Sequence, residues 1–249
     1  MGRTTIFPPA MPFTLHHKLL APGVCALLAF ATAASTESLL AASHQTPNFE
    51  VHAESQALAA AVGKTAESNR LSLAERWLGQ PLPAWKSRCR ITVVADPKGS
   101  GTGWTSYLVT HGAVENIEIT LRGRPDRLLE FVLPHEITHA ILVTFRGKLI
   151  PRWADEGVAM MSESETERLR QRLVLRQFAR SGNLPALRTV LDLAEYPDDK
   201  QQVRAFYAAS LSLTEFLVGQ SGQSSLFRFL GDGERLGWDQ AIEQHYDYQ

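Results

Sequence analysis

The 249-residue sequence contains few cysteines and no excess of charge of either sign. Cys25 and Cys89 are its only cysteines, too few for a small fold held together by disulfide bonds. Lys and Arg total 25 and Asp and Glu total 26, so the net charge is −1. Because nucleic-acid binding needs a basic surface to neutralise phosphates, we expect no nucleic-acid partner. Hydrophobic residues make up 44% of the chain, which is enough for one sizeable core and excludes an intrinsically disordered chain.

The apolar run near the N-terminus, residues 19–34, is short for a membrane span. It contains Pro22 and Gly23, and a spanning helix needs roughly 20 apolar residues. The run fits a secretory signal peptide over residues 1–33, cleaved after Ala33 in the pattern Ala31-Thr32-Ala33. Translation from Met11 would give a signal of more usual length, and an uncleaved amphipathic anchor is the alternative. We therefore expect a secreted or periplasmic protein with no stable membrane span after cleavage.

The rest of the chain predicts an α+β fold, with a small mixed or antiparallel sheet followed by a mostly helical core. Residues 34–85 read as a flexible start, over 34–48, and an N-terminal helix over 50–79. The sheet is expected over 86–125, with strands at 90–94, 104–109 and 118–121. Gly99, Gly101 and Gly103 read as a flexible loop. Helices are expected over 126–249, at 153–181, 185–194, 202–219, 224–231 and 238–246.

The motif His135-Glu136-Ile137-Thr138-His139 carries the chemistry. On a helix, two histidines four residues apart lie one turn apart on one face, so both imidazoles can reach one cation. Zinc favours such nitrogen ligands. Glu136 flanks the same face and can approach a water there, the placement that a general base needs. Pro134 either kinks the helix or marks its first turn.

The residues after the motif indicate where a third ligand would come from. A histidine supplied by the longer pattern H-E-x-x-H-x-x-G-x-x-H is excluded, because Leu142 and Phe145 stand where Gly and His are required. Glu156 follows His139 by 17 residues, in a second predicted helix after the turn at Gly147. Gly157 would allow close packing of backbones beside it.

These segments resemble the gluzincin group of zinc metallopeptidases, the peptidase MA-like family. The resemblance rests on VLPHEITHAIL, PRWADEGVA and the later FYAASLSL, and spans about residues 90–245. It implies a thermolysin-like core in which His135, His139 and Glu156 hold Zn²⁺. It also implies that the strand at 117–121 is the edge strand along which an extended peptide substrate pairs.

The sequence departs from the family at Met160. Many gluzincins carry an acidic residue at this position, where it orients a histidine ligand. Asp155 or Glu163 could take its place, although Asp155 also reads as a charge at a helix start. Loss of such an outer partner would weaken metal binding.

Two functional hypotheses follow. The first is an exported zinc metallopeptidase acting on a peptide or protein, with Glu136 as general base and Tyr207 as donor to the developing oxyanion. Tyr207 could instead be a core aromatic residue. The second is a catalytically weak or inactive peptidase-fold binding module of the cell envelope, suggested by Met160. A purely structural zinc site would need four protein ligands, and the sequence supplies three.

Overall fold

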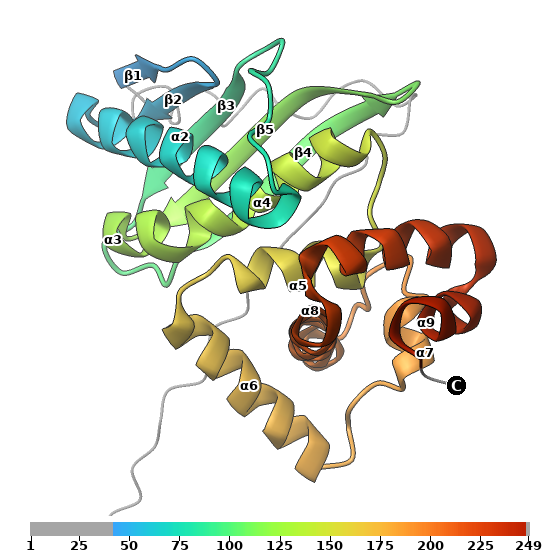
Figure 1. The fold of residues 1–249 in the computed structure, drawn as a ribbon. Coiled ribbons are helices and arrows are strands. Elements are labelled where there is room, and N and C mark those ends of the chain that lie inside the picture. Colours follow the sequence, from blue (N-terminus) through green and yellow to red (C-terminus); the bar gives the residue numbers. More distant parts are fainter. Residues whose placement is uncertain (1–41, 248–249) are drawn as a thin grey trace, which may run out of the picture.

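The computed structural model describes residues 42–247, so the predicted signal peptide and its cleavage site lie outside the described residues. A five-stranded mixed sheet is followed by a mostly helical region, which confirms the predicted α+β class (Figure 1). The strands are β1 (Ala42–Gln45), β2 (Phe49–Ala53), β3 (Cys89–Ala95), β4 (Thr102–Thr110) and β5 (Ala113–Gly123). The helices are α2 (Gln56–Leu78), α3 (Pro125–Arg127), α4 (Leu133–Arg146), α5 (Arg152–Met161), α6 (Glu165–Arg180), α7 (Leu187–Leu191), α8 (Lys200–Leu236) and α9 (Trp238–Tyr246).

Strand order corrects the prediction about the sheet edge. The order is β1-β2-β3-β5-β4, with β2, β3 and β5 parallel and the outer strands antiparallel to their neighbours. The predicted edge strand at 117–121 belongs to β5, which lies inside the sheet between β3 and β4. The edge strand on this side of the described sheet is β4, because the chain turns back at residues 111–112 and inserts β5 beside β3.

The N-terminal segment is also more ordered than the sequence predicted. Part of the expected flexible start forms β1, and residues 50–53 of the expected helix belong to β2 instead. Phe49, Val51 and Ala53 are fully buried at alternate positions, the period-2 pattern of a strand. The predicted helix is confirmed from residue 56 onward, and Gly79 ends it in the left-handed conformation.

Helices α2 and α4 pack on one face of the sheet (Figure 1). Ser55 caps the start of α2, because its hydroxyl accepts a hydrogen bond from the Leu58 backbone N–H. It connects β2 to β3, the crossover that two parallel strands require. Cys89, at the start of β3, is buried and free. Burial raises the pKa of its thiol.

The helix that carries the HEITH motif is preceded by a π-helical turn. Residues Leu128–Val132 form this turn, and the Leu133 N–H bonds to the Leu128 carbonyl. Pro134 then lies in the first turn of α4, as expected for a helix that restarts. By length and composition the segment Pro125–Arg146 is apolar enough to cross a membrane, but 78% of its apolar window is buried within the protein. Core helices of soluble proteins share this property, so the apolar character is accounted for by packing.

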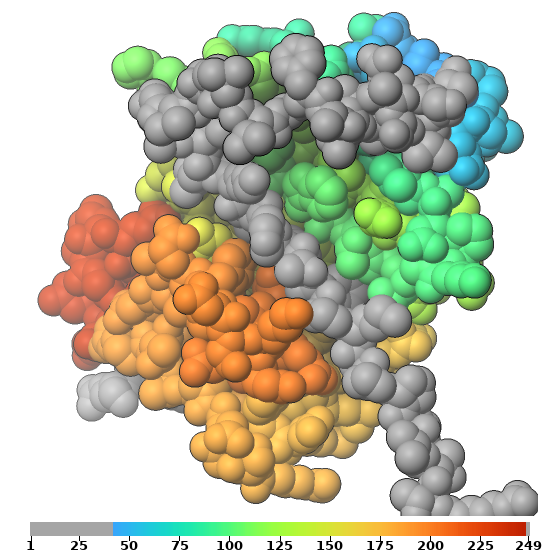
Figure 2. Space-filling model, turned by 180° about the vertical axis from the view of Figure 1, so that it is seen from behind, coloured from blue at the N-terminus to red at the C-terminus, as the bar shows by residue number. Residues whose placement is uncertain are grey.

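The second half of the chain packs helices around α5. The predicted helix at 153–181 is divided into α5 and α6, and those at 202–219 and 224–231 join as α8 with a non-helical residue at Gly222. Trp153 of α5 packs against Phe229 and Trp238, with ring centroids 6.2 and 5.9 Å apart. Seen from behind, the connection from α6 to α8 covers the outside of this helical half (Figure 2).

Gly157 brings α5 close to α8. A Cβ at this position would lie 2.0 Å from Thr214 Oγ1 and 2.6 Å from the Ser210 carbonyl oxygen. The predicted close packing of backbones is therefore confirmed, and the glycine sits next to Glu156.

We expect Gly157→Ala to destabilise the protein. The added methyl group would push α8 away, and overpacking typically costs about 1–3 kcal/mol, with a backbone clash favouring the upper end. Denaturant unfolding of the two proteins measures the change. Gly219→Ala, in an open part of α8, is the matched control and should be neutral or stabilise by up to about 1 kcal/mol. Equal stability of Gly157→Ala and the unmodified protein would contradict such a close approach of α5 and α8.

Candidate metal centre

Helix α4 presents His135 and His139 on one buried face. Their exposed fractions are 6% and 0%, and their ring centroids lie 4.9 Å apart in an edge-on arrangement. The neighbouring Ile137, Ile141 and Leu142 are fully buried in the core and fix the rotation of the helix. The motif is thus held rigidly, with both imidazoles turned toward α5.

Glu156 of α5 faces both rings, as the sequence predicted. Its Oε2 atom lies 3.5 Å from His135 Nε2 and 3.9 Å from His139 Nε2, and the three ligand atoms all fall within 4.8 Å of one another. Tetrahedral zinc, with bonds of about 2.0–2.1 Å, would separate its ligand atoms by about 3.3 Å. The three side chains therefore form a possible metal site. A small inward movement of the ligand atoms would bring them to the spacing that zinc requires.

The other nitrogen of each imidazole contacts a carboxylate. His135 Nδ1 lies 2.6 Å from Glu163 Oε1, and His139 Nδ1 lies 2.9 Å from Asp155 Oδ1. A histidine that donates its Nδ1 proton to a carboxylate keeps the Nε2 lone pair for a metal, and the contact also fixes the ring. Met160, at the position where many gluzincins carry an acidic residue, is buried in the core. In this chain Asp155 and Glu163 make the contacts between a carboxylate and a histidine ring.

Glu163 reaches His135 because the end of α5 is anchored to α2. The Trp77 indole N–H donates a hydrogen bond of 3.0 Å to Ser162 Oγ, and this hydroxyl lies 3.1 Å from the Val158 carbonyl. The Glu163 backbone N–H bonds to the Met160 carbonyl in the turn that follows. The carboxylate is consequently brought back over α4 and is 7% exposed.

Tyr196, which the sequence did not reveal, holds Glu156 from the other side, and Arg152 in turn holds Tyr196. The Tyr196 hydroxyl donates a hydrogen bond to Glu156 Oε1, which leaves Oε2 directed at the histidines. Arg152 stacks on the Tyr196 ring, 4.5 Å from its centroid, and donates hydrogen bonds to the Ala194 carbonyl and to Glu195. The segment between α7 and α8 is thereby fastened to the start of α5.

The charges around His135 favour its protonated form when no metal is bound. Burial alone would lower the pKa of this imidazole, but the contacts with Glu156 and Glu163 outweigh burial and raise the pKa well above its ordinary value. Protons and metal ions compete for the same nitrogen.

Glu136, the predicted general base, is held against β4. The Thr105 hydroxyl donates a hydrogen bond of 2.7 Å to Glu136 Oε2. Gly103, predicted to lie in a flexible loop, is instead a buried residue of β4, and a Cβ there would approach Glu136 Oε1 to 2.7 Å. The strand and the helix thus form a narrow slot in which only glycine leaves room for the carboxylate. The alternating strand pattern of Gly103 and Thr105 is the signal that could have revealed this contact.

Tyr207, the predicted oxyanion donor, lies on α8 with 6% of its surface exposed. Its ring packs against that of Tyr196, with centroids 5.9 Å apart. Burial raises the pKa of Tyr207 well above its ordinary value, and the charges of Glu156 and Glu136 raise it further. The hydroxyl therefore stays protonated and can donate a hydrogen bond beside the site.

Comparisons of the chain with protein-family models, with curated proteins and with solved structures find no match. The case for a metal site accordingly depends on the geometry of these side chains.

We expect Glu163→Gln and Asp155→Asn each to weaken binding of Zn²⁺, used as the probe ion, by about 10- to 100-fold. Each change removes the charge that orients one imidazole but leaves the three ligand residues intact. Equilibrium dialysis of the purified variants measures the affinity. Glu165→Gln is the matched control, because Glu165 pairs with Arg168 and Arg172 on α6. Affinities that stay unchanged in both variants would show that these carboxylates do not support the site.

Zn²⁺ affinity should also fall as the pH is lowered. Because the pKa of His135 is raised, protons begin to displace the metal at a pH above the ordinary pKa of histidine. Affinity is therefore expected to increase with pH through this region and to level off only above the raised pKa. Dialysis at a series of pH values provides the test, and a flat profile across the ordinary histidine range would contradict it.

Proposed function

We propose that this protein is an exported zinc-dependent metallopeptidase of gluzincin type that hydrolyses peptide bonds. The observation that carries the proposal is the convergence of two Nε2 atoms and one Glu156 oxygen, beside a separate carboxylate on the same helix. A purely structural zinc site has a closed set of four protein ligands. Here the described residues supply three ligands. They also place the carboxylate of Glu136 beside the site, and a structural metal ion has no use for such a group.

The residues present suit zinc, with His135, His139 and Glu156 as the ligands. Zinc, when bound, would act as a Lewis acid toward water and the scissile carbonyl. Glu136 would accept the proton of the attacking water and later deliver it to the leaving amine. Thr105 holds one oxygen of Glu136, so the carboxylate is oriented before substrate arrives. Tyr207 would donate a hydrogen bond to the oxygen that gains negative charge.

The substrate would bind as an extended peptide along β4. This strand is at the edge of the described sheet and passes directly over Glu136 at Gly103 and Thr105. An edge strand offers unpaired backbone groups, and a peptide that adds to it gains main-chain hydrogen bonds. The scissile bond would thus be brought to the general base by backbone pairing.

We favour this proposal over the competing hypothesis, an inactive binding module. It was suggested by Met160, and the contacts of Asp155 and Glu163 with the histidines supply what that position lacks. Export remains part of the proposal on the strength of residues 1–33 alone.

Glu136→Gln should retain zinc but lose peptide cleavage. Loss of general base catalysis is expected to lower the rate by about 10²–10⁴-fold. Zinc content is measured by mass spectrometry of the metal, and cleavage by incubating the protein with a proteome-derived peptide library. Glu130→Gln is the control, because Glu130 is an exposed carboxylate in the π-helical turn before α4. A Glu136→Gln protein that still cleaves peptides would refute the assigned role.

A further inference from the structure

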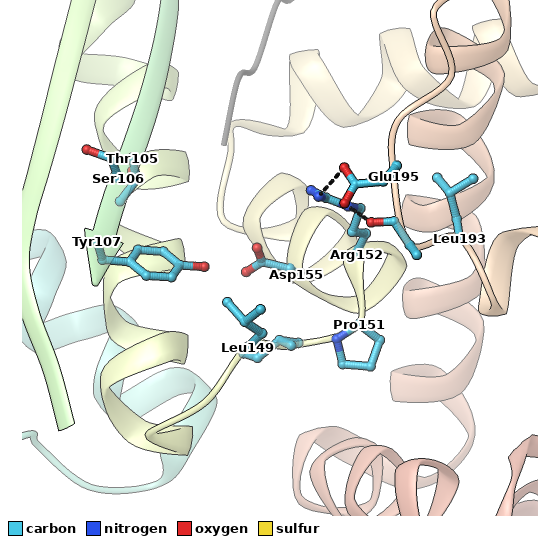
Figure 3. A pocket seen from close by; sticks show the side chains of 11 residues that line it. Thr105, Ser106, Tyr107, Leu149, Pro151, Arg152, Asp155, Leu193 and Glu195 are labelled. Atoms are coloured by element: carbon cyan, nitrogen blue, oxygen red, sulfur yellow. Dashed lines mark hydrogen bonds and ion pairs between the residues drawn. The ribbon is translucent and has the colours of Figure 1, made fainter. Parts of the chain in front are cut away.

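A cavity of about 240 Å³ is shown in Figure 3, and it lies beside the metal site because its lining residue Asp155 contacts His139. Three segments line it: Thr105 to Tyr107 of β4, the turn from Leu149 to Arg152 with Asp155 of α5, and residues 193–195. Two of these lining residues also touch the site. Asp155 contacts His139, and Thr105 contacts Glu136.

The charged groups of the cavity are already paired with other residues. Arg152 bonds to Glu195 and to the Ala194 carbonyl, and Asp155 is paired with His139. The wall left for an occupant is apolar, formed by the Tyr107 ring with Leu149, Ile150, Pro151 and Leu193. Figure 3 shows Leu149 and the Tyr107 ring facing the space in front of Asp155. Such a wall favours an apolar side chain over a charged one.

The size of the cavity suits a leucine-like or aromatic side chain. An apolar cavity of about 150 Å³ is enough to bind benzene. The cavity here, at about 240 Å³, has room for a phenyl ring or a branched aliphatic group.

The direction of β4 determines which side of the scissile bond the cavity serves. Along β4, Gly103 and Thr105 lie at Glu136, and Tyr107 follows two residues later at the cavity. Antiparallel pairing is the more stable arrangement per residue. In an antiparallel peptide, the residue opposite Tyr107 comes before the residues opposite Gly103 and Thr105.

We propose that this cavity binds an apolar side chain, aliphatic or aromatic, of the substrate residue on the N-terminal side of the cleaved bond. The inference rests on the proposed peptidase function, and it names the substrate class of that same site.

The test uses hydroxamates that bind the zinc-loaded full chain, so that no cleavage is needed. N-acetyl-leucine and N-acetyl-phenylalanine hydroxamates carry the side chain on the N-terminal side of the metal-binding group, and N-acetyl-glycine hydroxamate lacks it. Titration calorimetry should show that the leucine or phenylalanine compound binds about tenfold tighter or more than the glycine compound. Succinyl hydroxamates carry an isobutyl group on the C-terminal side of the metal-binding group. Filling the cavity should not change their affinity.

Leu149→Trp fills the cavity and should abolish the gain in affinity of the leucine and phenylalanine compounds over the glycine compound. Leu149 is 44% exposed, so the larger side chain does not disturb the core, and binding of the glycine compound verifies that the variant is folded and zinc-loaded. Leu187→Trp, at an exposed leucine of α7 outside the cavity, is the matched control and should keep the gain.

Each other outcome overturns a defined part of the proposal. Equal binding of the glycine and leucine compounds, or a gain that survives Leu149→Trp, overturns the cavity assignment and leaves the zinc site intact. A gain in affinity that is confined to the succinyl compounds and lost in Leu149→Trp would show that the cavity binds a side chain on the C-terminal side. That result overturns the assignment to the N-terminal side. Failure of every hydroxamate to bind the zinc-loaded chain overturns the open coordination position that the proposed peptidase function needs, and this inference with it.

Discussion

The carboxylate contact at Nδ1 of each imidazole is the interaction on which the site depends. Without Glu163 and Asp155, the rings of His135 and His139 could rotate, and either nitrogen could carry the proton. With them, both Nε2 atoms are directed at Glu156. The two carboxylates come from α5 and the turn after it, so the same element supplies one ligand and orients the other two.

The surrounding architecture keeps this element in place from three directions. Trp77 of α2 holds its end through Ser162, and Gly157 allows α8 to approach its middle. Arg152 fastens the segment that carries Tyr196 to the beginning of α5. Each of these contacts joins parts of the chain that are far apart in sequence, so the precision of the centre is a property of the whole fold.

What the sequence could predict depended on the distance between partners. His135, Glu136 and His139 were recognisable because one helical turn sets their spacing, and Glu156 followed from the next helix. Thr105 and Tyr196 were missed because their partners lie 31 and 40 residues away and no local pattern marks them. The edge strand was assigned wrongly because strand order is decided by pairing, which β5 shares with both β3 and β4. The short strand β1 has no buried residue, so no alternating apolar pattern marks it in the sequence. It is a strand because it pairs with β2.

The π-helical turn before α4 has a consequence for the length of this segment. Its i to i+5 bonding accommodates one residue more than an α-helical turn, just ahead of Pro134, whose ring would clash with the carbonyl four residues earlier in a regular helix. The turn therefore absorbs a residue that would otherwise rotate α4 by about 100° about its axis. Removing one residue from Leu128–Val132 would restore an α-helical turn and bring the Pro134 ring against that carbonyl. The extra residue thus gives Pro134 its place at the beginning of the helix that carries both histidines.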